Sequence, residues 1–137
     1  MVWLSRLSKM VMKESELVNK WVWLFHPTAL QWRRVRLGVV PTKEAAREYM
    51  VILRWADLVF VENGEVNIVE AKLRPSAGAI GQLEHYRELF RRTPEFQQYW
   101  NYPINLILLT PYLDLEIVAL CSKKGITYEH WNPEQET

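Results

Sequence analysis

Two carboxylates and an ammonium, those of Asp57, Glu70 and Lys72, are the groups in this chain whose types and spacing best suit catalysis. Carboxylates are hard oxygen ligands for Mg²⁺ or Mn²⁺, and such an ion also keeps several waters and binds substrate phosphates. The bound ion lowers the pKa of a water molecule and stabilises charge that develops on a phosphate. A neighbouring lysine would orient that water or neutralise the transition state. The trio suggests metal-dependent phosphodiester hydrolysis.

The elements that must bring these groups together are predicted to be a β-hairpin. Residues 56–62 and 65–73 are rich in Val, Ile, Leu and Phe, as β-strands are. Asn63-Gly64 between them favours a two-residue type I′ turn, because both central residues of that turn need positive φ. Counting back from the turn places Asp57 directly opposite Glu70, and the lysine two residues further on shares their face. The alternative is an ion pair at a sheet edge, with no metal.

At these residues the chain resembles the PD-(D/E)XK nuclease superfamily, which has the restriction-endonuclease-like fold. Ala56-Asp57 matches the Pro-Asp position, with Ala in place of Pro, and Glu70-Ala71-Lys72 matches (D/E)XK. The resemblance implies that Asp57, Glu70 and the carbonyl of Ala71 bind Mg²⁺ or Mn²⁺. It also implies that Lys72 is the catalytic cation.

A second motif extends the resemblance beyond the hairpin. Gln82-Leu83-Glu84-His85-Tyr86 is similar to the QxxxY motif of the RecB-like branch, and Holliday-junction resolvases are the other branch that the chain resembles. The two outer residues are one helical turn apart and share a face. The resemblance gives Gln82 a site-organising role, whereas Tyr86 would help with phosphate or with packing. His85, between them, is expected to be a partly exposed helix histidine.

The superfamily usually has a further acidic residue on its first helix, and the sequence leaves its position open. Glu44 and Glu48 lie on one candidate helix, and Glu14 and Glu16 lie on another. Glu48 is included among the candidate catalytic residues.

Basic residues near the hairpin are candidates for contacts with nucleic acid. Residues 31–39 alternate enough to form a strand, and they contain Arg33, Arg34 and Arg36. In a regular strand Arg34 would share a face with both Arg36 and Trp32, giving a basic and aromatic stripe that would follow a phosphate backbone. A solvated strand face is the alternative. Arg74, in the loop after the hairpin, is a further candidate.

The other patterns predict an α/β sandwich with a central mixed sheet flanked by helices. A single domain over residues 1–137 is expected, with an N-terminal helical and strand part at 1–54 and a catalytic core at 55–131. The remaining predicted elements are helix 4–20, strand or irregular turn 21–30, a helix from Thr42 to about Arg54, loop 74–78, helix 79–92, strand 102–109, helix 114–124 and strand 126–131.

Composition limits the function classes. The chain has 137 residues and a formal net charge of +1, so any case for nucleic acid rests on local charge. Its one cysteine, Cys121, excludes an internal disulfide and is expected to be a packed core thiol. No segment reaches the roughly 20 apolar residues of a membrane span, and a cytoplasmic location is expected.

The sequence therefore favours a metal-dependent DNA nuclease that is directed by DNA structure or by a protein partner. By resemblance to the resolvase branch a homodimer is expected, and a phage or mobile-element origin would suit so small a nuclease. Two alternatives remain: a catalytically inactive nuclease-fold protein that binds nucleic acid, and an assembly protein whose charged hairpin end is an ion-pair cluster.

Overall fold

The computed structural model describes residues 12–39 and 54–134. The predicted helix from Thr42, which contains Glu44 and Glu48, lies outside these residues, as does the first part of predicted helix 4–20. Arg54, where that later helix was predicted to end, belongs instead to a strand.

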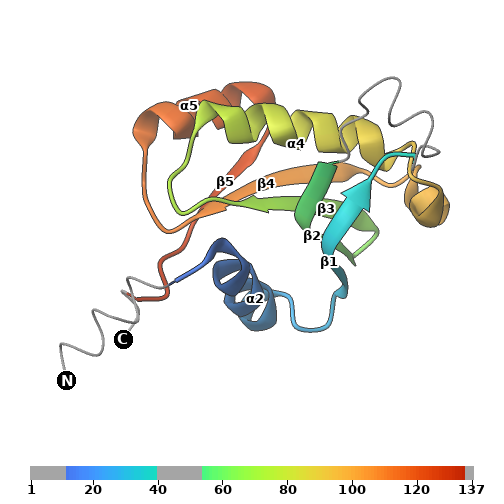
Figure 1. The fold of residues 1–137 in the computed structure, drawn as a ribbon, viewed down its shortest axis with the longest axis horizontal. Coiled ribbons are helices and arrows are strands. Elements are labelled where there is room, and N and C mark those ends of the chain that lie inside the picture. Colours follow the sequence, from blue (N-terminus) through green and yellow to red (C-terminus); the bar gives the residue numbers. More distant parts are fainter. Residues whose placement is uncertain (1–11, 40–53, 135–137) are drawn as a thin grey trace, which may run out of the picture.

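The centre of the molecule is one five-stranded mixed sheet (Figure 1). Neighbouring strands follow the chain order, so the sheet begins as an antiparallel meander of three strands and continues with two strands parallel to the third. This confirms the predicted mixed sheet. The strands are β1 (Leu30–Leu37), β2 (Arg54–Glu62), β3 (Glu65–Ala71), β4 (Ile104–Thr110) and β5 (Thr127–His130).

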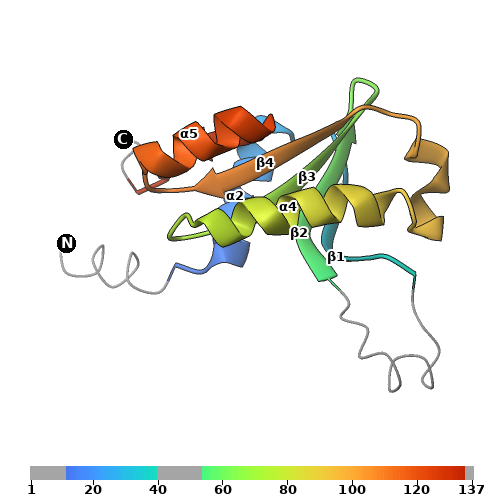
Figure 2. The same ribbon diagram turned by 90° about the horizontal axis from the view of Figure 1, so that it is seen from above.

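Helices cover both faces of this sheet, which confirms the predicted sandwich. Helix α2 (Glu14–Phe25) lies against one face, and α4 (Ala77–Phe90) and α5 (Leu115–Lys124) lie over the other (Figures 1 and 2). The sequence did not predict the short 3₁₀ helix η1 (Pro94–Tyr99) that follows α4. Among the described residues, no helix has both the length and the apolar character needed to cross a membrane.

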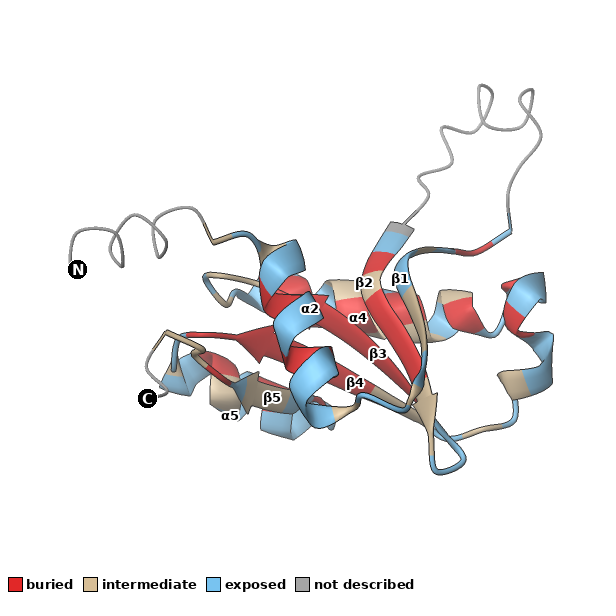
Figure 3. Ribbon diagram, turned by 90° about the horizontal axis from the view of Figure 1, so that it is seen from below, coloured by how far each residue is buried: buried red, intermediate tan, exposed pale blue. Residues whose placement is uncertain are grey.

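Each face of the sheet has its own apolar core. The core on the α2 side joins that helix to one set of strand residues, which includes Leu58, Phe60 and Val69. The core on the α4 side is larger and includes Val66, Ile68 and Cys121. Because helices cover both faces, every residue of β3 except Glu65 is buried, and Figure 3 shows the buried residues concentrated in the central strands. Cys121 is a buried thiol, as predicted.

The predicted hairpin turn is confirmed. Glu62 pairs with Glu65, and the two residues between them have positive φ, 53° for Asn63 and 77° for Gly64. A type I′ turn requires this conformation at both positions, and its twist matches that of the flanking strands.

The prediction that residues 21–30 form a strand or irregular turn was wrong for Trp21–Phe25, which belong to α2. Bulky aromatic and β-branched residues favour strands, but tertiary packing overrides that preference here. The apolar residues recur with helical spacing, and they bury one stripe of α2 against the sheet: Leu17, Val18, Trp21 and Val22.

Candidate active site

The open end of the hairpin, opposite its turn, gathers the predicted carboxylates. Counted from the turn, the last pair of the β2–β3 ladder is Leu58–Val69, and Asp57 lies one residue beyond it. The Ala71 N–H, which a longer ladder would occupy, donates to Oδ2 of Asp57 at 2.8 Å. The prediction that Asp57 pairs directly with Glu70 was therefore wrong in detail, because the strands separate there. The side chain of Asp57 nevertheless reaches β3.

Glu70 is a buried carboxylate in this arrangement. Its residue surface is only 5% exposed, and its Oε2 has no hydrogen-bond partner among the described residues. Burial raises the pKa of Glu70 to about 8, and a hydrogen bond and charge repulsion from Asp57 act in the same direction. A buried polar atom without a partner is costly. The site therefore favours a bound proton or a cation at Glu70.

Tyr86 belongs to the same cluster and comes from α4. Its ring is buried, and its hydroxyl donates to the carbonyl of Trp55 at 2.8 Å. A side-chain hydrogen bond between Tyr86 and Glu70 also lowers the pKa of Glu70, against the larger effect of burial. Tyr86 thus joins the start of β2 to the carboxylate on β3, in keeping with its predicted place beside the site.

Gln82 takes a different position, although it lies one turn before Tyr86. It lines a shallow pocket of about 310 Å³ with Gly78, Gly81 and His85. Among the described residues it has no hydrogen bond to the carboxylates or to the lysine of the site. His85 is exposed, as expected.

Lys72 directly follows β3. Its N–H donates to the carbonyl of Leu109 at 2.9 Å, so the parallel neighbour β4 fixes its backbone. The positive charge of Lys72 lowers the pKa of Glu70, but Lys72 forms no ion pair within the described part of the chain. The ion pair that the non-catalytic interpretation requires is therefore not formed among these residues.

Glu14, one of the candidates for the further acidic residue, contacts the chain directly after the hairpin. It is the first residue of α2, and its Oε2 accepts a hydrogen bond from the N–H of Leu73 at 3.0 Å. The helix is thereby joined to the residue after Lys72, and Glu14 also lines a pocket with Asp57. The helix was predicted over residues 4–20, so the sequence placed Glu14 within a helix, and it does not indicate which loop Glu14 meets. Glu16 is exposed.

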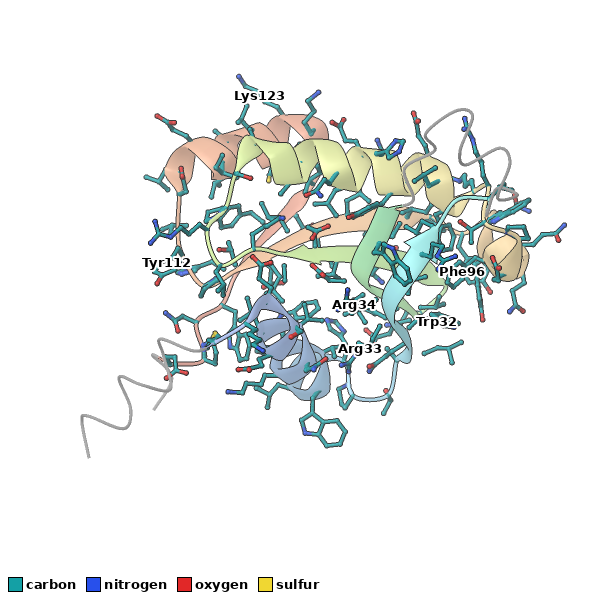
Figure 4. All side chains as sticks on the ribbon, in the orientation of Figure 1. Trp32, Arg33, Arg34, Phe96, Tyr112 and Lys123 are labelled. Atoms are coloured by element: carbon teal, nitrogen blue, oxygen red, sulfur yellow. The ribbon has the colours of Figure 1, made fainter. Side chains whose placement is uncertain are left out.

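The predicted stripe of Trp32 and Arg34 was wrong. Trp32 packs edge-on against Phe96, with ring centroids 5.1 Å apart, on the α4 side of the sheet. Arg34 lines the pocket on the α2 side instead (Figure 4). Its φ of 50° interrupts the alternation of side chains on which the prediction depended.

The other arginines have separate surroundings. Arg33 donates to the side chains of Asn19 and Gln31, and Arg36 lies 4.8 Å from the ring centre of Trp55. Arg74 lines another pocket of about 760 Å³, together with residues 112–116, which end the loop after β4 and begin α5.

The donors at this site fit a hard divalent cation. Within the described residues no group of three or more His, Cys, Asp or Glu side chains is placed to hold a metal ion. Mg²⁺ needs fewer, because it commonly binds one or two carboxylates and keeps several waters. Asp57, Glu70 and the carbonyl of Ala71 offer such a set, and the buried Oε2 of Glu70 has no hydrogen-bond partner in the part of the chain that the structure describes.

Comparison with solved structures identifies a nuclease-like fold. A repair endonuclease from Pyrococcus abyssi has a TM-score of 0.57 and 15% identity over 89% of this chain and 48% of its own. EndoMS in complex with double-stranded DNA has a TM-score of 0.57 and 18% identity over 92% of this chain and 48% of its own. Protein VC1899 from Vibrio cholerae has a TM-score of 0.54 and 15% identity, covering 85% of this chain and 29% of its own.

The chain therefore spans about half the length of the two endonucleases and less of the third protein. No family model and no curated protein sequence matches it. At these identities the likeness shows the fold: a mixed α/β sheet flanked by helices, shared with DNA repair endonucleases.

Proposed function

We propose that this protein is a divalent-metal-dependent DNA nuclease of the PD-(D/E)XK type. The observation that carries the proposal is the buried carboxylate of Glu70, whose Oε2 has no partner among the described residues although Asp57 lies beside it. A fold has little reason to bury a carboxylate beside a second, half-buried one for stability alone, because the second raises the cost of ionising the first. Active sites are where such pairs are expected.

Asp57, Glu70 and the carbonyl of Ala71 would hold the metal ion. When bound, Mg²⁺ or Mn²⁺ would supply an acidified water and charge stabilisation at the phosphate. The hydrogen bond from the Ala71 N–H to Asp57 fixes the carboxylate relative to β3. Such preorganisation keeps both donors close without reorganisation during the reaction.

Lys72 and Tyr86 would support the chemistry from two sides. Lys72 would neutralise charge on the phosphate or orient the attacking water, and its backbone is fixed by β4. Tyr86 would hold the start of β2 against Glu70 through its buried hydroxyl. In this proposal Gln82 acts from the neighbouring turn of α4, and Glu48 remains a candidate for the further acid.

The DNA substrate is inferred from the fold and from local charge. One structure of EndoMS is a complex with double-stranded DNA, and the alignment with it covers 92% of this chain and 48% of EndoMS. Arg33, Arg34, Arg36 and Arg74 are the candidate phosphate contacts. Targeting by a protein partner, a homodimer and a cytoplasmic location stay predictions.

A panel of labelled substrates with Mn²⁺ tests the proposal most directly. We expect the wild-type protein to cleave at least one of duplex, single-stranded, flap and four-way-junction DNA, and we expect Asp57→Asn to be inactive on the same substrate. Calorimetric titration with Mn²⁺ should give binding to the wild type and none to Asp57→Asn. DNA binding without metal binding or cleavage would favour the inactive nuclease-fold alternative, and absence of all three would favour an assembly protein.

A further inference from the structure

The pairing of β1 with β2 is interrupted at one position. Arg33 pairs with Leu58, and Val35 pairs with Ala56, but the residues between them, Arg34 and Asp57, do not pair. The register is the same on both sides of the gap, so each strand contains one residue that the ladder skips. The irregularity lies beside a predicted metal ligand.

The gap also changes which face of the sheet each strand presents. Leu58 belongs to the core on the α2 side, whereas Ala56 and its partner Val35 contact the core on the α4 side. Residues two apart in a regular strand share a face. The alternation of side chains between the two faces therefore shifts by one residue in both strands, at Arg34 in β1 and at Asp57 in β2. Irregularities of this kind next to active sites re-aim side chains.

Arg34 adopts a conformation that arginine seldom takes. Its φ is 50°, in the left-handed region that glycine and asparagine tolerate best. No turn accounts for it, in contrast to Asn63 in the hairpin loop. A strained residue persists only where its surroundings fix it, and such residues cluster at functional sites.

The guanidinium of Arg34 also differs from those of its neighbours. Arg33 donates to two side chains, and Arg36 lies over Trp55, whereas Arg34 is exposed and has no hydrogen bond or ion pair among the described residues. It lines a pocket of about 540 Å³ together with Asp57, Glu14 and Trp55. Figure 4 shows Arg33 and Arg34 both between the sheet and α2.

We propose that Arg34 binds the phosphate that is cleaved, rather than a phosphate further along the DNA. A planar guanidinium offers two parallel N–H donors to the non-bridging oxygens of a phosphate. Its place in the pocket beside Asp57 would put that phosphate next to the proposed metal ligands. The inference rests on the proposed nuclease function. It adds a residue that positions the phosphate to the three motif residues of the hairpin, Asp57, Glu70 and Lys72.

Arg34→Gly provides the main test because it removes the guanidinium and also the strain. We expect a melting temperature at least equal to that of the wild type, unchanged Mn²⁺ binding, and single-turnover cleavage on the order of a hundredfold slower. Arg34→Asn, which tolerates the same backbone conformation, should behave alike. Arg92→Ala is the matched control: it removes an exposed arginine that lies after α4 and does not line this pocket, and it should change cleavage less than tenfold.

Chemical rescue separates phosphate binding from a structural role. Millimolar guanidinium should restore part of the cleavage by Arg34→Gly and leave cleavage by Arg92→Ala unchanged, whereas a merely structural role predicts no rescue. If the wild-type protein cleaves DNA and Arg34→Gly cleaves it at the same rate, this inference is overturned and the nuclease proposal is unaffected. A wild-type protein that cleaves none of the four DNA substrates with Mn²⁺ would overturn the nuclease proposal, and the inference with it.

Discussion

The two ends of the β2–β3 hairpin contain similar residues in opposite circumstances. At the turn end, Glu62 lies 2.8 Å from Nδ1 of His26, and Glu65 accepts a hydrogen bond from Asn105 at 3.1 Å. These carboxylates have partners and contact solvent. At the open end, Glu70 is 5% exposed, and its Oε2 has no partner among the described residues. The difference shows that a buried carboxylate oxygen without a partner, rather than charge alone, distinguishes the candidate site from the turn end.

Backbone conformation gives the same contrast. Both ends contain a residue with φ near 50°, Asn63 at the turn and Arg34 beside the open end. Asparagine followed by glycine favours the turn locally, so the chain and the fold agree there. At Arg34 local preference and the fold disagree. Such conflicts are expected at functional sites, where stability is given up for geometry.

Lys72→Ala should have the largest selective effect. The ammonium is a cation beside the carboxylates but not a metal ligand, so its loss should spare metal and DNA affinity while cleavage slows on the order of a hundredfold or more. Single-turnover kinetics with Mn²⁺, together with calorimetry, measures both. Glu70→Ala should lose metal binding and cleavage together, whereas Glu65→Ala, at the turn end, should keep both. If Lys72→Ala cleaves DNA at the wild-type rate, Lys72 is not catalytic and its role is structural.

The stability of the metal-free protein should depend on pH through Glu70. Because the pKa of Glu70 is raised from 4.5 to about 8, the folded protein keeps a proton that the unfolded chain releases. This stabilisation is complete below about pH 4.5, declines as pH rises and is lost above about pH 8, a change on the order of a few kcal/mol.

Urea unfolding in the presence of a chelator, repeated across this pH range, measures that slope. Glu70→Gln should flatten it, because the amide does not ionise, and Glu65→Gln is the matched control that should keep it. Adding Mn²⁺ should stabilise the wild type most at high pH, where the carboxylate is ionised and free to bind. An identical slope in wild type and Glu70→Gln would remove Glu70 from this role.

The regular parts of the fold could be predicted from the sequence because they depend on local patterns. Asn63-Gly64 fixed the hairpin turn, Gly125 ended α5 with φ of 69°, and Asp114 capped the start of that helix. These signals act over a few residues. The turn correctly predicted the pairing of β2 with β3 as far as Leu58. The prediction was wrong one residue later, at Asp57, where contacts from α4 and β1 influence the position of β2.

The rest of the candidate site depends on contacts between distant segments. Nothing near Glu14 indicates that it meets Leu73, and nothing near Tyr86 indicates that it meets the carbonyl of Trp55. The left-handed conformation of Arg34 is likewise invisible in its neighbours, because strand alternation predicts the opposite face. Residue types and spacing identified Asp57, Glu70 and Lys72 as candidates. The burial and the hydrogen-bond partners of these residues could be described only from the three-dimensional structure.

Gly64→Ala should have the smallest effect and should be confined to the turn end. The φ of Gly64 is 77°, where an L side chain is strained, but a Cβ there would meet no atom within 4 Å. Strain alone should therefore destabilise the protein by about 1 kcal/mol, which urea unfolding can resolve. Metal binding and cleavage should stay at wild-type levels, because the turn lies at the far end of the hairpin from Asp57 and Glu70. A large loss of metal affinity in this variant would show that the two ends are coupled, and the contrast between a structural end and a functional end would then fail.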